Sequence, residues 1–137
     1  PGENDMKRLI LLGFLAVSPQ AFAQSDQVAK YQEVIQADIS LGADAGIAQS
    51  CGLRSRKWAQ DTVVYAITGV GVVAQNLWGN SSHVLSPVGE TQFNAAVSKI
   101  GDAFRQGISA SPKYCTEMMA TNHLAEIDGM LHDAGMD

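Results

Sequence analysis

The chain has 137 residues, with 14 aspartates and glutamates against 9 lysines and arginines and a formal net charge of −5 at pH 7. This acidic balance excludes nucleic acid as a partner, because binding to phosphates requires clustered Lys and Arg side chains. The length is typical of one domain, and the sequence shows no internal repeat.

Residues 1–23 have the pattern of a leader with a cleavable export signal. A short basic start at residues 6–8 precedes an apolar stretch over residues 9–17, and the small residues Ala21 and Ala23 follow. We expect cleavage near Ala23, which leaves residues 24–137 as a single helical domain in the periplasm or the surrounding medium.

The exported part opens with an amphipathic pattern that predicts a helix over residues 25–50, capped by Ser25 or Asp26. Cys51 continues the apolar stripe of this helix, so we expect its side chain to face the core. The predicted stripe follows spacings of three and four: Val28, Tyr31, Ile35, Ile39, Ala43 and Ile47.

Cys51 and Cys115 are the only two cysteines. In an oxidising compartment such a pair predicts one intramolecular disulfide, which would close a loop of about 65 residues and contribute on the order of 4 kcal/mol. The sequence has no C-x-x-C motif, so redox exchange, thiolate metal binding and haem attachment have no support.

A second helix is predicted from Ser55, with a bend or break at Gly69 and Gly71. No charged residue occurs over residues 62–89. The most apolar run, residues 63–74, is too short to cross a bilayer, and the charges around it oppose the positive-inside rule. We therefore expect a central core helix and no membrane span in the exported part.

Residues 77–89 have the composition of a loop, with Gly, Asn, Ser and a Ser-Pro pair. Trp78 and His83 are the residues here that could face a ligand, so they form the candidate binding surface. The alternative is that Trp78 closes one end of the core while His83 is simply exposed.

A third helix is predicted over residues 91–107, and Ser111 followed by Pro112 has the N-cap and N1 order of a new helix. A last amphipathic segment ends near Gly135, and one of its sides is apolar: Leu124, Ile127, Met130 and Leu131. Four or five helices with both cysteines on apolar faces predict an all-α fold, a small bundle stapled by one disulfide.

The C-terminal stretch is rich in His and Met, residue types that can hold copper in exported proteins. Asp128 and His132 are four residues apart and share a helix face. His123 and His132 are nine residues apart, on opposite sides of an ideal helix, so they cannot share an ion without a break. We predict no metal and no other cofactor, with His123, Asp128 and His132 as weak metal candidates.

The three histidines lie in no known catalytic motif. The leading hypothesis is an exported, non-catalytic protein-binding domain of an inhibitor, immunity or accessory type, whose partner is another envelope or secreted protein. In format the chain is similar to periplasmic immunity proteins and to periplasmic acid-stress chaperones, so an acid-activated chaperone is the alternative. A second alternative is an enzyme of unrecognised type, which a pocket lined by His83 or His123 with a carboxylate would favour. The oligomeric state stays open.

Overall fold

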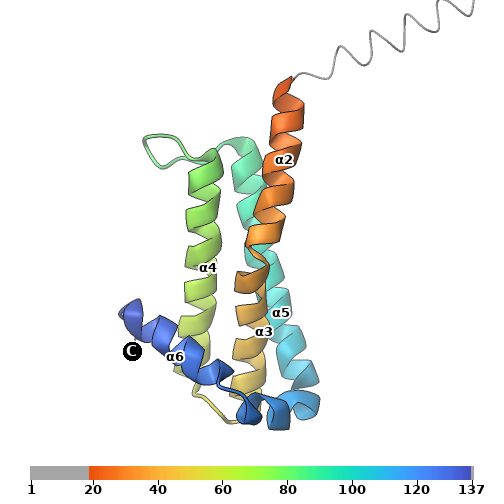
Figure 1. Cartoon of the computed structure of the whole chain (residues 1–137), viewed down its shortest axis with the longest axis vertical. Helices are drawn as coiled ribbons and strands as arrows, with labels where there is room; N and C mark the ends of the chain where they lie inside the picture. Colours follow the sequence, from red (N-terminus) through yellow and green to blue (C-terminus); the bar gives the residue numbers. More distant parts are fainter. Residues whose placement is uncertain (1–18, 137) are drawn as a thin grey trace, which may run out of the picture.

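The chain forms helices along one long axis and a final helix across one end (Figure 1). A computed structural model describes residues 19–136, with side chains from residue 24; the predicted export signal lies outside the described residues as far as residue 18. These helices and the Cys51–Cys115 disulfide confirm the predicted all-α bundle. The helices are α2 (Pro19–Val34), α3 (Gln36–Ser50), α4 (Arg56–Trp78), α5 (Pro87–Ala120) and α6 (His123–Asp133).

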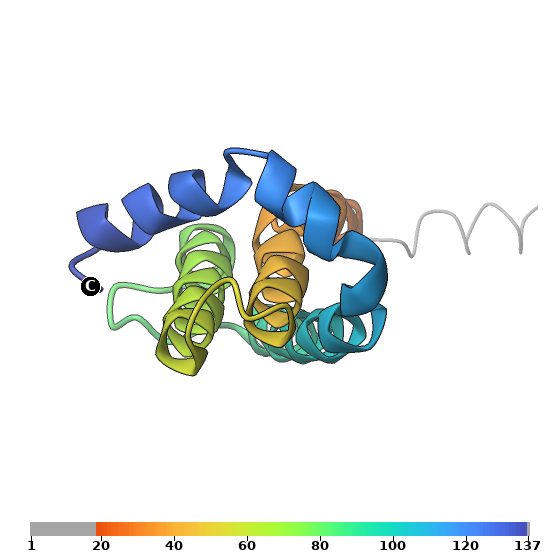
Figure 2. The ribbon, with the colours of Figure 1, turned by 90° about the horizontal axis from the view of Figure 1, so that it is seen from below.

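Helices α2 and α3 form one bent column, α4 runs back beside it, and α5 runs in the same direction as α3 (Figure 1). A view from below shows the lower end of α5 and then α6 passing around one side of this group (Figure 2). The main core lies between these helices and includes the fully buried side chains of Tyr31, Ile35, Val70 and Ile100.

The single helix predicted over residues 25–50 is in fact two helices that meet at Ile35. The hydrogen-bond ladder continues through this position, since the Ile35 amide donates to Tyr31 (3.0 Å) and the Ile39 amide to Ile35 (3.0 Å). The helical stretch also begins at Pro19, so the predicted start at Ser25 or Asp26 is wrong.

The predicted buried stripe is confirmed at Tyr31 and Ile35 but is wrong further along, where Ala43 and Ile47 are only partly buried. Small residues replace them on the face toward α5. The buried residues of α3 are Leu41, Gly42, Ala45, Gly46 and Ala48.

Helices α3 and α5 touch through their backbones. A Cβ atom at Gly46 would lie 2.2 Å from the Phe104 carbonyl oxygen, and one at Gly107 would lie 2.3 Å from the Ala43 carbonyl oxygen. Gly42 is similar, because a Cβ there would lie 2.7 Å from the Ile100 carbonyl oxygen. Glycine is the residue that permits such close backbone approach, so this contact depends on glycines from both helices.

Helix α4 begins as predicted, with the Ser55 hydroxyl accepting a hydrogen bond from the Trp58 amide at 3.1 Å. The predicted break at Gly69 and Gly71 is wrong, because the helix continues to Trp78. The two glycines instead allow neighbouring side chains to approach closely, and the predicted loop shortens to residues 79–86.

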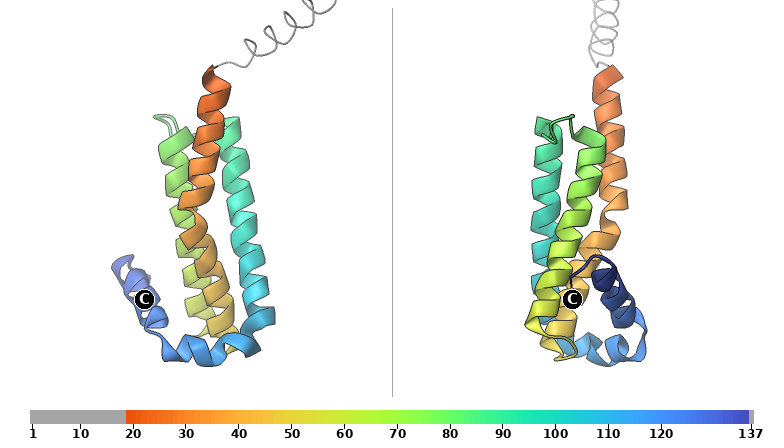
Figure 3. Two further views of the ribbon diagram at one scale, coloured as in Figure 1. Left: turned by 45° about the vertical axis from the view of Figure 1, so that its right-hand side comes forward. Right: turned by 90° about the vertical axis from the view of Figure 1, so that its left-hand side faces the viewer.

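Helix α5 is longer at both ends than predicted. Ser86 caps it by accepting from the Gly89 amide at 3.2 Å, and Pro87 occupies its first turn, so this Ser-Pro pair starts a helix. The predicted new start at Ser111 and Pro112 is wrong, because Pro112 lies inside the same helix. The ribbon nevertheless turns sharply toward its lower end (Figure 3), as expected where proline removes a backbone donor.

The disulfide joins the end of α3 to the part of α5 beyond this turn, with the Cys51 and Cys115 Cα atoms 5.6 Å apart. Helix α6 then packs its predicted apolar side against the core through three buried residues: Leu124, Ile127 and Leu131. Over residues 19–136, no helix is both long enough and apolar enough to span a membrane.

Candidate functional site

The two residues predicted as a binding surface lie in different environments. Trp78 is the last residue of α4 and is only 9% exposed, with its ring edge-to-face against Tyr31 at a centroid distance of 5.1 Å. His83 is exposed at the tip of the following loop with a φ of 60°. The structure thus places Trp78 in the core and His83 at the surface.

The outer side of α4 is a more extensive surface. Along it run Val64, Thr68, Val72 and Asn76, spaced four residues apart, and we call this row the α4 face. Val64 is 50% and Val72 is 54% exposed, and none of the described helices covers them. Helix α4 buries Ala59, Ala66 and Ala74 together with Thr62, Val70 and Trp78 on its opposite side, and Val64 and Val72 remain in solvent.

A hollow borders the α4 face on each side, and Thr68 and Val72 contribute to both. The first, about 550 Å³, is the Asp38 hollow, lined by Asp38, Tyr65, Thr68, Gly69, Val72, Val73, Ala134 and Met136. The second, about 470 Å³, is the Phe93 hollow, lined by Thr68, Gly71, Val72, Gln75, Asn76, His83, Leu85 and Phe93.

Among residues 19–136, Asp38 is the one Asp, Glu, Lys or Arg that lines either hollow. It lies in the first turn of α3 and packs over Gly69 of α4, where a Cβ atom would lie 2.7 Å from its Oδ1. Burial raises the pKa of Asp38, because a carboxylate loses solvation beside apolar groups. Within the described residues its carboxylate has neither a hydrogen bond nor an ion pair.

Sequence reasoning missed both Asp38 and the α4 face. The uncharged run over residues 62–89 was a usable signal, because a helix that is apolar on all sides must cover its outer side or offer it to a partner. No feature of the sequence indicates that Asp38 lies close to Gly69, because this contact arises from the packing of two helices.

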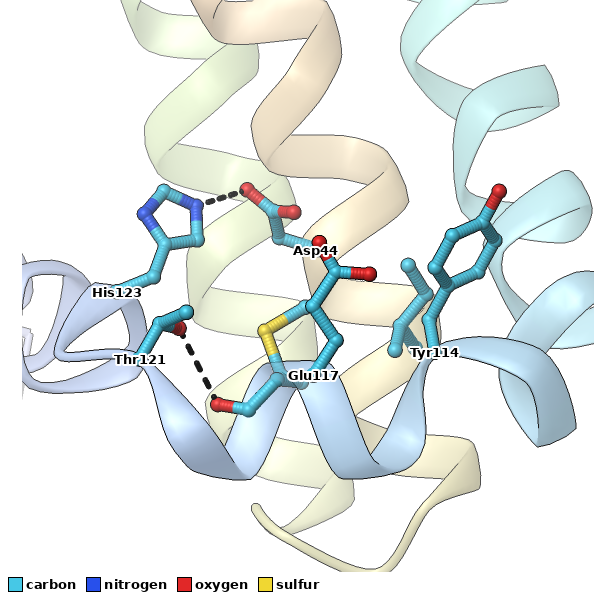
Figure 4. Close-up of a pocket in the computed structure, with 7 residues that line it drawn as sticks. Asp44, Tyr114, Glu117, Thr121 and His123 are labelled. Carbon is cyan, nitrogen blue, oxygen red and sulfur yellow. Dashed lines mark hydrogen bonds and ion pairs between the residues drawn. The ribbon is translucent and has the colours of Figure 1, made fainter.

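A third cavity, of about 380 Å³, lies between α3, the end of α5 and α6 (Figure 4). His123 Nε2 is 2.6 Å from Asp44 Oδ2, and Nδ1 is 3.7 Å from Glu126 Oε2. Hydrogen bonding to Asp44, aided by the charges of both carboxylates, raises the pKa of His123. The ring is therefore stabilised as an imidazolium that ties α6 to α3.

This cavity meets the condition that would favour an enzyme, a histidine beside a carboxylate. Nε2 of His123 is engaged by Asp44, and Nδ1 lies 3.7 Å from Oε2 of the exposed Glu126. The hydroxyl of Thr121, which also lines the cavity, donates a hydrogen bond to the Met118 carbonyl at 3.4 Å (Figure 4).

The weak metal candidates are not brought together. Asp128 accepts hydrogen bonds from Arg54 Nη2 (2.7 Å) and Nε (3.1 Å) and from Trp58 Nε1 (2.6 Å). His123 pairs with Asp44 instead, and His132 lies further along α6. Across residues 19–136, no group of three or more His, Cys, Asp or Glu side chains is arranged to hold a metal ion.

We predict that the His123–Asp44 pair stabilises the fold in mild acid. Because the folded pKa is raised, the contribution is fully present below the ordinary histidine pKa and is lost as the pH rises through the folded value. The variant His123→Asn should lower the thermal midpoint at about pH 5.5 and have little effect at about pH 9. The control His83→Asn, on an exposed loop, should change neither, and equal losses at both pH values for His123→Asn would contradict the pair.

Strong acid, in contrast, is expected to lower the stability of the fold by protonating Asp128. Hydrogen bonds from Arg54 lower the pKa of Asp128, so its contribution to stability is present at neutral pH and is lost as the pH falls through the lowered value. Mild acid therefore tightens α6 through His123, and release through Asp128 requires a pH below about 4. An acid-activated chaperone that released α6 through Asp128 would therefore do so only below about pH 4.

Comparisons with protein-family models, with curated proteins and with solved structures found no match for this chain.

Proposed function

We propose that this protein is a non-catalytic binding domain whose partner is another protein outside the cytoplasm, and that the α4 face is its contact surface. The observation that carries the proposal is an uncharged helix face left open by the described helices, on which Val64 and Val72 are exposed beside two hollows with largely apolar lining, in a chain of net charge −5. Contiguous exposed apolar surface on a small protein commonly marks an interaction site.

The shape of this surface also supports binding. A ridge of side chains between two hollows offers both a projection and recesses, which favour close packing against a partner. The exposed loop adds Val84, which is 59% exposed, next to the Phe93 hollow. The rim carries charge in the Lys57–Asp61 ion pair near the start of α4.

The location outside the cytoplasm is supported by the predicted export signal and by the disulfide, since structural disulfides persist in oxidising compartments. Two further features support binding over catalysis: no catalytic motif occurs in the sequence, and the hydrogen bond to Asp44 raises the pKa of His123, which favours its cationic form.

The proposal predicts position-specific crosslinking. A photoreactive residue such as p-benzoylphenylalanine at Val72, in cells that export the chain, should yield a discrete adduct with one partner protein. The same residue at Ser98, which is exposed on α5 and lines neither hollow, should not. In addition, Val72→Glu should weaken the interaction at least tenfold, because it places a charge in the contact, whereas Ser98→Glu should not. Identical adducts from both positions, or none from Val72, would refute the proposed surface.

A further inference from the structure

The Asp38 hollow is the recess on the α4 face whose chemistry specifies what should occupy it. We propose that it receives one lysine or arginine side chain of the partner protein, whose cationic head pairs with Asp38 and whose aliphatic stem lies along the apolar wall. This inference rests on the proposed function, because it names what the partner presents to the α4 face.

The position of the carboxylate is the first argument. Asp38 lies against α4 where Gly69 has no side chain, so its carboxylate oxygens line the hollow close to the helix backbone. The nearby Tyr31 hydroxyl is already committed, because it donates to the Val70 carbonyl at 2.9 Å. The described side chains therefore leave the charge of Asp38 unpaired.

The walls provide the second argument. Tyr65, Val72, Val73 and Met136 line the same hollow with apolar atoms, and no Lys, Arg or His of the described residues lines it. Lysine and arginine side chains combine a long apolar stem with a charged head, and they lay the stem on such surfaces. A carboxylate with reduced solvation forms a stronger hydrogen-bonded pair with a cation than one in bulk water.

A purely structural role for Asp38 is the competing explanation. A carboxylate in the first turn of a helix interacts favourably with the helix dipole, and Asp38 occupies such a position in α3. On that explanation Asp38→Asn should destabilise the protein at neutral pH. Because burial raises the pKa of Asp38, its ionised form instead costs stability in the free protein, and we expect Asp38→Asn to be at least as stable.

The test uses the purified, oxidised protein and three blocked peptides that differ at one position. Each peptide carries a single lysine, arginine or norleucine between valine and serine residues, so that norleucine retains the stem but lacks the charge. Binding is followed by NMR through the backbone amides of Asp38, Gly69 and Val73. The lysine or arginine peptide should bind about tenfold more tightly than the norleucine peptide.

The variant Asp38→Asn should abolish this discrimination while leaving the weak affinity for the norleucine peptide unchanged. The matched control is Asp102→Asn, which removes one negative charge from an exposed ion pair with Arg105 on α5. It should preserve the preference for the basic peptides. Equal binding of all three peptides to the native protein, or an unchanged preference in Asp38→Asn, would overturn the inference.

Failure of this inference can be separated from failure of the proposed function. If Val72 crosslinks one partner and Asp38→Asn leaves that adduct intact, the α4 face binds a partner without a basic side chain in the hollow. If Val72 yields no adduct, the proposed function fails, and the peptide experiment still decides whether the hollow selects a cation.

Discussion

Replacing Gly46 with alanine is expected to lower the free energy of unfolding by about 1–3 kcal/mol, as overpacking of a close-packed contact typically does. The added Cβ would lie 2.2 Å from the Phe104 carbonyl oxygen and 3.0 Å from the Ile108 amide nitrogen. Both atoms belong to the α5 backbone, so rotation of a side chain cannot relieve the clash. The two helices must move apart, and the contacts along their whole interface loosen.

The intrinsic preference of the helix acts against this loss. Alanine is more favourable than glycine within a helix by about 1 kcal/mol, so the substitution would stabilise an isolated α3. A net destabilisation in urea or guanidinium unfolding therefore reports the interhelical clash. Gly46→Val adds further atoms at the same position and should leave no stable folded state, because total stabilities of such domains are only about 5–15 kcal/mol. Its unfolding curve should therefore lack a cooperative transition.

Gly129→Ala is the matched control for this experiment. Gly129 lies within α6, and an added Cβ there meets no other atom within 4 Å. This variant should gain up to about 1 kcal/mol from helix preference alone. If Gly46→Ala and Gly129→Ala shift the unfolding midpoint in the same direction, the close contact between α3 and α5 does not exist in solution.

The same contact explains where prediction from the sequence succeeds and fails. Apolar periodicity identifies helices correctly when large side chains form the stripe, as with Tyr31 and Ile35 in α2 and Ile127 in α6. It fails for α3, because a face made of Gly42 and Gly46 contributes little hydrophobicity. This face nevertheless packs closely against the backbone of α5. A hydrophobicity pattern gives no information on how closely the backbones of two helices approach each other.

Sequence signals for the start of a helix were likewise reliable only where interactions within one helical turn determine that start. The start of α4 at Ser55 was predicted correctly, because it depends on a hydrogen bond within one turn, from the Trp58 amide to the Ser55 hydroxyl. The start at Ser111 was predicted wrongly because this residue lies in the interior, where its hydroxyl bonds to that of Ser50 at 2.8 Å. Tertiary contacts there keep the helix continuous through Pro112.

The candidate site was less predictable than the fold. Trp78 was chosen for its residue type, but Tyr31 and the backbone of Gly89 enclose its ring. In the sequence, Asp38 is one of several acidic residues expected on a helix surface, and its position against α4 is seen only in the structure. Sites formed where helices cross depend on the packing of residues distant in sequence, which one chain does not reveal.

Removing the disulfide is the second change for which a large loss of stability is expected. The Cys51–Cys115 bond spans 64 positions, and the loss of its constraint on the unfolded chain should cost about 4 kcal/mol. Unfolding of the oxidised protein, of the reduced protein and of the double variant Cys51→Ala with Cys115→Ala should be compared. The denaturant dependence of the free energy should rise on reduction, because the unfolded chain becomes less compact.

The reduced protein is the control for lost packing, since it retains both sulfur atoms whereas the double variant does not. If the cross-link itself provides the stability, both forms should lose nearly the same amount. A large loss in the double variant alone would assign the effect to packing around the cysteines. Identical midpoints for the oxidised and reduced proteins would refute the stabilising role.

The position of the bond also predicts which part of the protein loosens first. Besides apolar packing, the contacts that hold the segment after Pro112 include the disulfide, the His123–Asp44 pair and the Asp128 hydrogen bonds to Arg54 and Trp58. The last two depend on ionised carboxylates, and the disulfide does not. In strong acid, hydrogen exchange should therefore accelerate across α6 at a higher pH in the reduced protein than in the oxidised one. Equal exchange profiles in the two forms would show that the disulfide does not hold this segment when its ion pairs are lost.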